Sequence, residues 1–152
     1  MKESGNDASK IDQTDLKIIE ILQEDGRTAN NEIAARLSLS EGTIRNRIAK
    51  LVKHNYLKVR GLINPSKFID KQLVYLLLSV PLRQGWMNIG EKLAQLPEVR
   101  SVSLLTGRFD MLLEVFIAPS ELAEFISEKI GILEGVNSTE SIMVLKQFNK
   151  WI

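Results

Sequence analysis

The chain has 152 residues, a formal net charge of +1, 44% hydrophobic and 26% charged residues, which is typical of one globular domain or two small ones. It contains no cysteine, which excludes disulfides, zinc–thiolate centres and cysteine nucleophiles and fits a reducing compartment. Met1–Lys10 is polar throughout, unlike a signal peptide, and the longest apolar run, Leu73–Leu78, is too short to span a bilayer. We therefore expect a cytoplasmic protein with no membrane partner.

The first half of the chain predicts a disordered lead-in and then three helices joined by short turns. Apolar residues recur in it at helical spacing. Asp12 is the candidate N-cap of the first helix, whereas Thr28 and Asn30 both qualify for the second. The lead-in is expected at Met1–Lys10, and the helices at residues 12–24, 28–37 and 40–55.

The third of these helices is basic on its outer face. Ser40 is a good N-cap, whose hydroxyl can accept from the N–H of Thr43, and Asn55 tolerates the left-handed conformation that ends a helix. One face is apolar, and between Arg45 and Arg60 there are six Arg or Lys and no acid. A short helix, a turn and a capped basic helix form a helix-turn-helix, whose second helix enters the major groove of double-stranded DNA.

The polar side chains of this helix are the candidate DNA contacts. Asn46 can pair with adenine, and Arg45 or Lys50 with guanine. Arg47 lies close to the apolar stripe, so bracing of the domain is an alternative role, and a solvated face is the alternative for the whole set. The candidates are Ser40, Thr43, Arg45, Asn46, Arg47, Lys50 and Lys53.

The stretch after the basic helix predicts the end of the first domain. Tyr56–Ile63 alternates apolar and polar residues, which indicates a strand or wing, and Asn64-Pro65 closes it. We expect a winged helix-turn-helix domain over residues 11–63 and a linker over 64–71.

The second half predicts strands and helices in the order β-α-β-β-α-β. The strands are expected at Gln72–Leu82, Val99–Leu105, Asp110–Ile117 and Val136–Phe148, and the helices at Trp86–Leu96 and Pro119–Leu133. Two right-handed β-α-β units with antiparallel central strands give the ferredoxin-like fold, so the whole chain is an α+β protein. Helices cover one sheet face only, so we expect a second copy on the other and hence a homo-oligomer.

Both halves together resemble the Lrp/AsnC family of transcription regulators over about Ile11–Lys150. The resemblance lies in the order and spacing of short motifs. They are Ile11-Asp12 with Asp15, Ile19–Leu22, Asp25-Gly26-Arg27, Glu32-Ile33-Ala34, Leu39-Ser40, Arg47-Ile48 with Leu51, Asn64-Pro65, Pro97-Glu98-Val99, Thr106-Gly107 with Asp110, and Gly135-Val136. It implies that residues 72–152 form an effector-binding and oligomerisation (RAM) domain. It also implies an amino acid or related effector, and a homodimer that assembles to a tetramer or octamer.

The resemblance also implies a ligand site at a hairpin turn. From the residues alone, Thr106–Asp110 is an ordinary turn, whereas the family binds its small ligand there. N–H groups around Gly107 would hold a carboxylate and Asp110 an ammonium group. Arg108 adds a cation, and Phe109 replaces a tyrosine common in the family. The candidate effector-binding residues are Thr106, Gly107, Arg108, Asp110, Ser138, Thr139 and Ser141.

Nothing in the sequence indicates catalysis. His54 is the only histidine, and we find no metal-ligand cluster, glycine-rich phosphate loop or nucleophile elbow. We therefore expect no enzyme activity, cofactor or metal. Two alternatives to an effector-responsive regulator remain open at this point. One is an architectural DNA-binding protein without an effector, and the other is a small-molecule sensor or enzyme built on the ferredoxin-like half.

Overall fold

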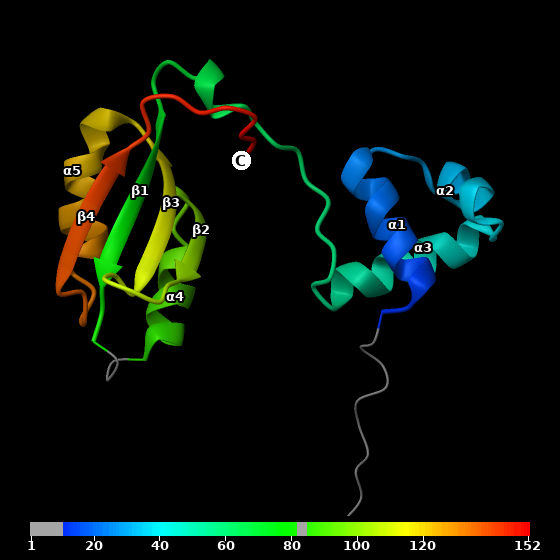
Figure 1. Ribbon diagram of the computed structural model, residues 1–152, viewed down its shortest axis with the longest axis horizontal. Helices are drawn as coiled ribbons and strands as arrows, with labels where there is room; N and C mark the ends of the chain where they lie inside the picture. The colour runs from blue at the N-terminus through cyan, green and yellow to red at the C-terminus, as the bar shows by residue number, and fades with distance from the viewer. Residues whose placement is uncertain (1–10, 82–84) are drawn as a thin grey trace, which may run out of the picture. The chain divides into compact units, whose positions relative to one another are not determined.

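The computed structural model describes residues 11–81 and 85–152, which fall into two compact units (Figure 1). The first unit ends at Gly61 and the second begins at Leu62. The expected lead-in, Met1–Lys10, and Leu82 at the end of an expected strand lie outside the described residues. Within them, the helices lack the length and apolar character of a membrane span.

The first unit consists of three helices around a small apolar core. They are α1 (Gln13–Glu24), α2 (Asn30–Leu37) and α3 (Glu41–Lys53), close to the predicted bounds. Each helix contributes two residues to the buried cluster, which consists of Ile18, Leu22, Ile33, Ala34, Ile44 and Leu51. The burial of side chains from every helix fixes their mutual packing.

Two of the three helices begin at the predicted caps. Asp12 and Asp15 form a reciprocal capping box, in which each carboxylate accepts from the other residue's N–H at 2.9 and 3.0 Å. Ser40 Oγ accepts from the N–H of Thr43 at 3.1 Å. The expectation for α2 was wrong, because it begins after Ala29 with no side-chain cap. The hydroxyl of Thr28 instead donates to the carbonyl of the preceding turn.

The chain leaves α3 through a left-handed residue and then runs without regular structure. Asn55 has φ 60°, as its position predicted, and the N–H of Tyr56 donates to the Leu51 carbonyl at 2.9 Å. The strand or wing expected over residues 56–63 is not formed. The helical unit offers no neighbouring strand in its described residues, and a strand needs one to satisfy its backbone groups.

The second unit is a four-stranded antiparallel sheet with helices on one face. The strands are β1 (Gln72–Ser79), β2 (Val99–Leu104), β3 (Met111–Ile117) and β4 (Ser138–Met143), in the order β2-β3-β1-β4. The helical segments are α4 (Trp86–Ala94), η3 (Pro119–Glu121), α5 (Leu122–Glu124) and the π-helix η4 (Phe125–Ile130); η1 (Pro65–Lys67) precedes β1. This confirms the ferredoxin-like arrangement.

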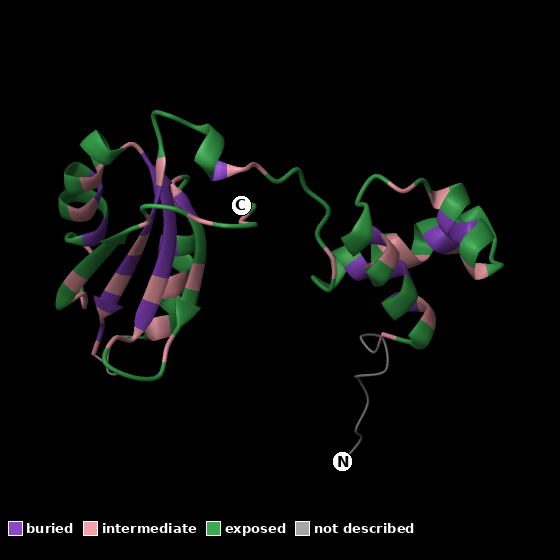
Figure 2. Ribbon diagram, turned by 45° about the horizontal axis from the view of Figure 1, so that its top comes forward, coloured by how far each residue is buried: buried purple, intermediate pink, exposed green. Residues whose placement is uncertain are grey.

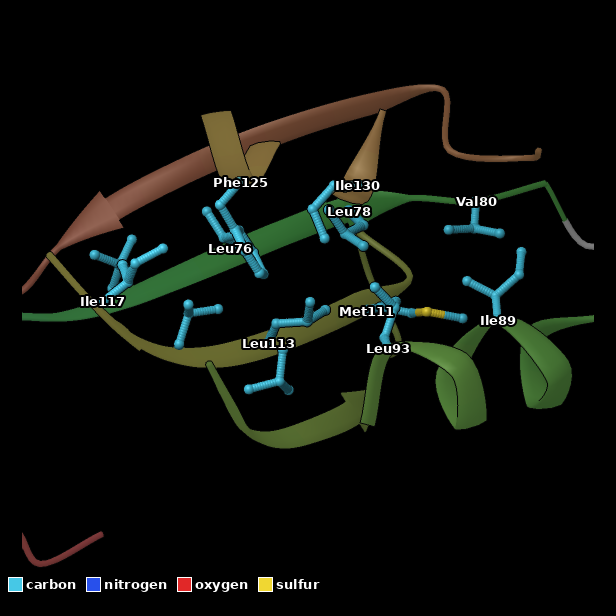
Figure 3. Packing of buried hydrophobic residues seen from close by; sticks show 13 residues of the cluster. Leu76, Leu78, Val80, Ile89, Leu93, Met111, Leu113, Ile117, Phe125 and Ile130 are labelled. Atoms are coloured by element: carbon cyan, nitrogen blue, oxygen red, sulfur yellow. The ribbon is translucent and has the colours of Figure 1, made fainter. Parts of the chain in front are cut away.

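The core of this unit lies between the central strands and the helices. Burial is concentrated along β1 and β3 (Figure 2). Figure 3 shows Leu76 and Leu113 of these strands facing Leu93 of α4 and Phe125 and Ile130 of the π-helix. β1 is hydrogen-bonded to β3 and β4, and β3 is hydrogen-bonded to β1 and β2, so β1 and β3 are the two central strands of the sheet.

The π-helix ends at a residue that must be glycine. The N–H of Gly131 donates to the Ile126 carbonyl at 2.8 Å, a bond between residues five apart. A β-carbon at Gly131 would lie 2.9 Å from the Ser127 carbonyl oxygen, which is closer than such atoms approach.

The final residues cross the sheet face that the helices leave open. Lys150 Nζ lies 2.7 Å from the carboxylate of Glu114, which projects from β3 and is 8% exposed. This contact raises the pKa of the Lys150 ammonium. Ile63 and Ile152 exchange two backbone hydrogen bonds, at 2.9 and 3.1 Å. β4 is therefore shorter than expected, because the chain after Met143 leaves the strand to make these contacts.

Replacing Lys150 tests this contact. Lys150→Met leaves Glu114 without its charged partner, so we expect the free energy of unfolding to fall by about 1–3 kcal/mol. Urea denaturation of the sheet unit measures it. Lys146→Met is the matched control, because Lys146 is exposed and lies over Phe148 rather than a carboxylate. Equal stability of the two variants would contradict the role assigned to the pair.

Candidate nucleic-acid interface and ligand turn

The outer face of α3 presents most of the predicted DNA contacts to solvent. Asn46, Lys50 and Lys53 are exposed, and Thr43 is partly exposed at the first turn. Ser40 and Thr43 hydroxyls lie 2.8 Å apart, so the cap leaves hydroxyl groups at the amino end of the helix. Small hydrogen-bonding side chains with lysines at the rim suit entry into a major groove.

Arg47 is directed back into its own unit rather than outward. Its Nη1 lies 2.8 Å from an oxygen of Asp12 and 2.8 Å from an oxygen of Asp15, at the start of α1. The two carboxylates raise the pKa of the guanidinium. The N–H of Asp15 and this guanidinium in turn hold the pKa of the Asp12 carboxyl below its usual 3.8. Arg47 therefore braces α3 against α1, as the alternative interpretation of its position predicted.

Arg45 is paired more weakly. It lies 2.7 Å from Glu41 one turn earlier, but both side chains are at least half exposed. An exposed pair of this kind contributes about 0.3–0.5 kcal/mol, so phosphate or guanine can displace Glu41.

A hollow lies beside the outer face of α3. It has a volume of about 420 Å³ and is lined by Asp12, Asp15, Thr43, Asn46, Arg47 and Lys50. Arg47 pairs with both carboxylates of this lining, whereas Asn46 and Lys50 have no partner in the described residues and remain for a ligand.

The candidate ligand turn joins β2 to β3 and is attached to β1. Thr106, Gly107 and Arg108 are exposed at its tip, where Gly107 has φ 139° and the Arg108 guanidinium lies over Phe109. Asp110 is half-buried, and its Oδ2 accepts from the N–H of Val80 at 2.7 Å. Its second oxygen makes no hydrogen bond within the described residues and remains for a cationic group.

The candidates on β4 lie on the other side of β1 from Asp110. Thr139 pairs with Leu78 and Ser141 with Leu76, so both side chains share the face that the helices cover. Ser138 pairs with Ser79 and faces the opposite way. The three residues thus do not form one cluster. Asp110 precedes β3, on one side of β1, and β4 lies on the other side, so two strand spacings, about 10 Å, separate Asp110 from them.

The sequence offered a signal for only some of these partners. Glu41 and Arg45 stand four residues apart, which is a recognisable helical ion pair. Asp12 and Arg47 are 35 residues apart, and no local pattern links them. Within the described residues, no group of three or more His, Cys, Asp or Glu is arranged to hold a metal ion.

A helix-turn-helix unit followed by a ferredoxin-like unit defines a class of DNA-binding regulators, and the comparisons identify the family. Residues 11–52 match the AsnC-type helix-turn-helix domain, and residues 74–150 match the Lrp/AsnC ligand binding domain. The chain is 36% identical over 143 residues to an uncharacterized HTH-type transcriptional regulator of Pyrococcus furiosus, covering 93% of this chain and 95% of that one.

Two further relatives cover nearly the whole chain. The HTH-type transcriptional regulator LysM of Saccharolobus solfataricus is 32% identical over 138 residues, with 91% of this chain and 96% of that one covered. The transcriptional regulator NMB0573 of Neisseria meningitidis, solved as a complex with L-Met, is 26% identical with a TM-score of 0.72, covering 93% and 94% of the chains. The chain belongs to the Lrp/AsnC family, and is a DNA-binding transcriptional regulator with a ligand-binding domain, not an enzyme.

The bracing role of Arg47 can be separated from a role in binding DNA. Arg47→Gln removes the positive charge that pairs with buried Asp15. In the absence of DNA, we expect the free energy of opening of the α1 and α3 amides, measured by hydrogen exchange, to fall by about 1.5–3 kcal/mol. Arg45→Gln, on the same helix, is the control and should change it by less than about 0.5 kcal/mol.

The contact between Arg47 and Asp12 predicts that the stability of the helical unit depends on pH. The pKa of Asp12 is lower in the folded chain than its usual 3.8, so its contribution is present above that pH and is lost as the pH falls through the folded-state pKa. The difference between wild type and Arg47→Gln should therefore shrink below pH 3.8. A difference that stays constant at lower pH would contradict the ion pair.

Proposed function

We propose that this protein binds specific sequences in double-stranded DNA through α3 and responds to an amino acid or related small molecule bound by its second unit. The proposal assigns DNA binding to residues 11–63 and effector binding and assembly to residues 72–152. The observation that carries it is the exposed face of α3, where Asn46 and Lys50 have no partner in the described residues while neighbouring Arg47 is neutralised. A DNA partner also supports a cytoplasmic location.

The α3 face supports sequence recognition rather than charge attraction alone. An asparagine amide can donate to and accept from one adenine edge, which a lysine cannot. Ser40, Thr43, Arg45, Lys50 and Lys53 surround Asn46 and supply further edge and phosphate contacts. Arg47 contributes by holding α3 in place.

The ligand turn supports an effector with both an anionic and a cationic group. The free oxygen of Asp110 suits an ammonium group, and Arg108 together with the N–H groups around Gly107 suits a carboxylate. Thr106, Ser138, Thr139 and Ser141 are polar neighbours for the remainder of the ligand. The L-Met complex of the Neisseria relative supports an amino acid as the ligand class.

The open face of the sheet supports assembly of copies of this chain. Large apolar side chains are exposed on β4 and the tail that follows it, namely Ile142, Leu145, Phe148 and Trp151, and Ile142 shares the open face with Tyr75. Surface of this kind is usually covered by a partner. A homodimer, assembling further to a tetramer or octamer, would hold two α3 helices at a fixed separation of roughly 34 Å, one turn of DNA.

Asn46 gives the first test. With a site selected from a random DNA pool, Asn46→Ala should weaken binding about 5–150-fold, which corresponds to 1–3 kcal/mol, without changing the affinity for random-sequence DNA. A titration by fluorescence anisotropy measures both. Asn88→Ala, at an exposed position of α4 in the second unit, is the control. Wild-type protein that does not distinguish the selected duplex from a random one would overturn sequence-specific binding.

Asp110 gives the second test. Asp110→Asn keeps an oxygen to accept from Val80 but removes the charge for an ammonium group. We expect one of the amino acids to raise the melting temperature of the wild type, with a stabilisation of about 2.7 kcal/mol at 100 times its Kd, and this gain to be lost in the variant. If no amino acid changes the wild-type melting temperature, the effector-independent architectural role is favoured instead.

A further inference from the structure

Six cations lie between Arg45 and Arg60, and the structure divides them into two groups. Arg45 donates to Glu41, and Arg47 donates to Asp12 and Asp15. The other four make no ion pair or hydrogen bond with any residue that the structure describes, and all are exposed. They are Lys50, Lys53, Lys58 and Arg60. Four of the six cations are therefore unpaired within the described residues, and two of these four lie beyond α3.

Lys58 and Arg60 belong to Leu57–Gly61, a segment without regular structure that follows α3 (Figure 1); we name it the basic arm. The arm is packed against the helical unit at Leu57 and passes near it again at Val59. Leu57 packs against the helical core, and its N–H donates to the Leu51 carbonyl at 3.3 Å. A methyl group of Val59 lies 3.5 Å from where a β-carbon on Gly26 would be, next to the end of α1.

The cations of the arm alternate in sequence with two apolar residues, Leu57 and Val59. Leu57 is packed against the helical core, whereas Val59 lies near Gly26 and is 51% exposed. Lys58 and Arg60 are both exposed. The arm thus carries two exposed cations on a stretch of chain whose first residue is packed beside the carboxyl end of α3.

The chemistry of the arm suits phosphate groups. Ammonium and guanidinium groups only donate hydrogen bonds and phosphate oxygens accept them, and the sequence from Lys50 to Gly61 contains no Asp or Glu. A helix in the major groove has phosphate backbones on both sides, which come close to the segments that flank it. We propose that the basic arm binds DNA phosphates next to the groove that α3 reads. This proposal rests on the proposed function.

Such a contact adds affinity without sequence discrimination. Each neutralised phosphate releases counterions, which steepens the fall of log K with log salt concentration by about 0.9. Two cations per arm therefore account for a slope of about 1.8 per bound arm. Asn46 instead contributes to the difference in affinity between the selected and the random duplex. The salt slope and this difference therefore report on the arm and on Asn46 separately.

The test is a salt titration of the full chain with Lys58→Gln and Arg60→Gln combined. The probes are the selected duplex and a random-sequence duplex of equal length. We expect the slope to fall by about 1.8 per bound arm on both duplexes, with their affinity ratio unchanged. The ratio of wild-type affinity to variant affinity should therefore be about 12-fold smaller per arm at 200 mM salt than at 50 mM salt.

Two further variants interpret the result. Lys67→Gln with Lys92→Gln removes the same charge from exposed positions in the second unit and should leave the slope unchanged. Lys58→Arg with Arg60→Lys keeps the charge and should retain the wild-type slope. Three results would each contradict the phosphate contact of the basic arm. They are an unchanged slope in the glutamine variant, an equal fall of the slope in the second-unit control, and a loss of affinity for the selected duplex alone. If the arm proposal fails, the proposed function still stands provided that Asn46→Ala weakens binding to the selected duplex and not to the random one. If the wild type binds neither duplex, both fail.

Discussion

One guanidinium connects the first turn of α1 to the middle of α3. Asp12 and Asp15 each accept from a backbone N–H of the other and from Arg47, so the same two carboxylates cap one helix and orient another. The cap and the brace are therefore not independent. Anything that loosens the first turn of α1 also removes the support of the face that carries Asn46, although the two places lie more than thirty residues apart.

Asp110 has the corresponding role in the second unit. Its carboxylate accepts from Val80, and its own N–H donates to the Leu78 carbonyl, so the turn between β2 and β3 is bonded to the end of β1. β1 is one of the two central strands of the sheet and pairs with β3 and β4. A ligand that takes up the second oxygen of Asp110 would thus act on the centre of the sheet rather than on a loose loop, which is the physical requirement for a response beyond the turn itself.

Local chemistry in the sequence predicted most of the elements and few of the long-range contacts. The hydroxyl of Ser40, the left-handed tolerance of Asn55 and the alternation of apolar residues in the strands act over a few residues, so they are visible in sequence. The alternation of apolar and polar residues over Tyr56–Ile63 wrongly predicted a strand, because periodicity does not reveal whether a partner strand exists. The sequence allowed two roles for Arg47, a DNA contact or a brace within its own unit. The ion pair between Arg47 of α3 and Asp15 of α1 supports the second role. The candidate site residues on β4 remain predictions.

The π-helix has a consequence for how this chain compares with its relatives. Phe125 and Ile130 are both buried against the sheet although they are five residues apart, because the wider turn brings this spacing onto one face. In an ordinary α-helix the same two contacts would need a spacing of four. A homologue that is one residue shorter here would keep the same side chains in the core, and would also be released from the need for glycine at the position of Gly131. The π-helix is thus a place where the loss of a single residue is compatible with both core contacts.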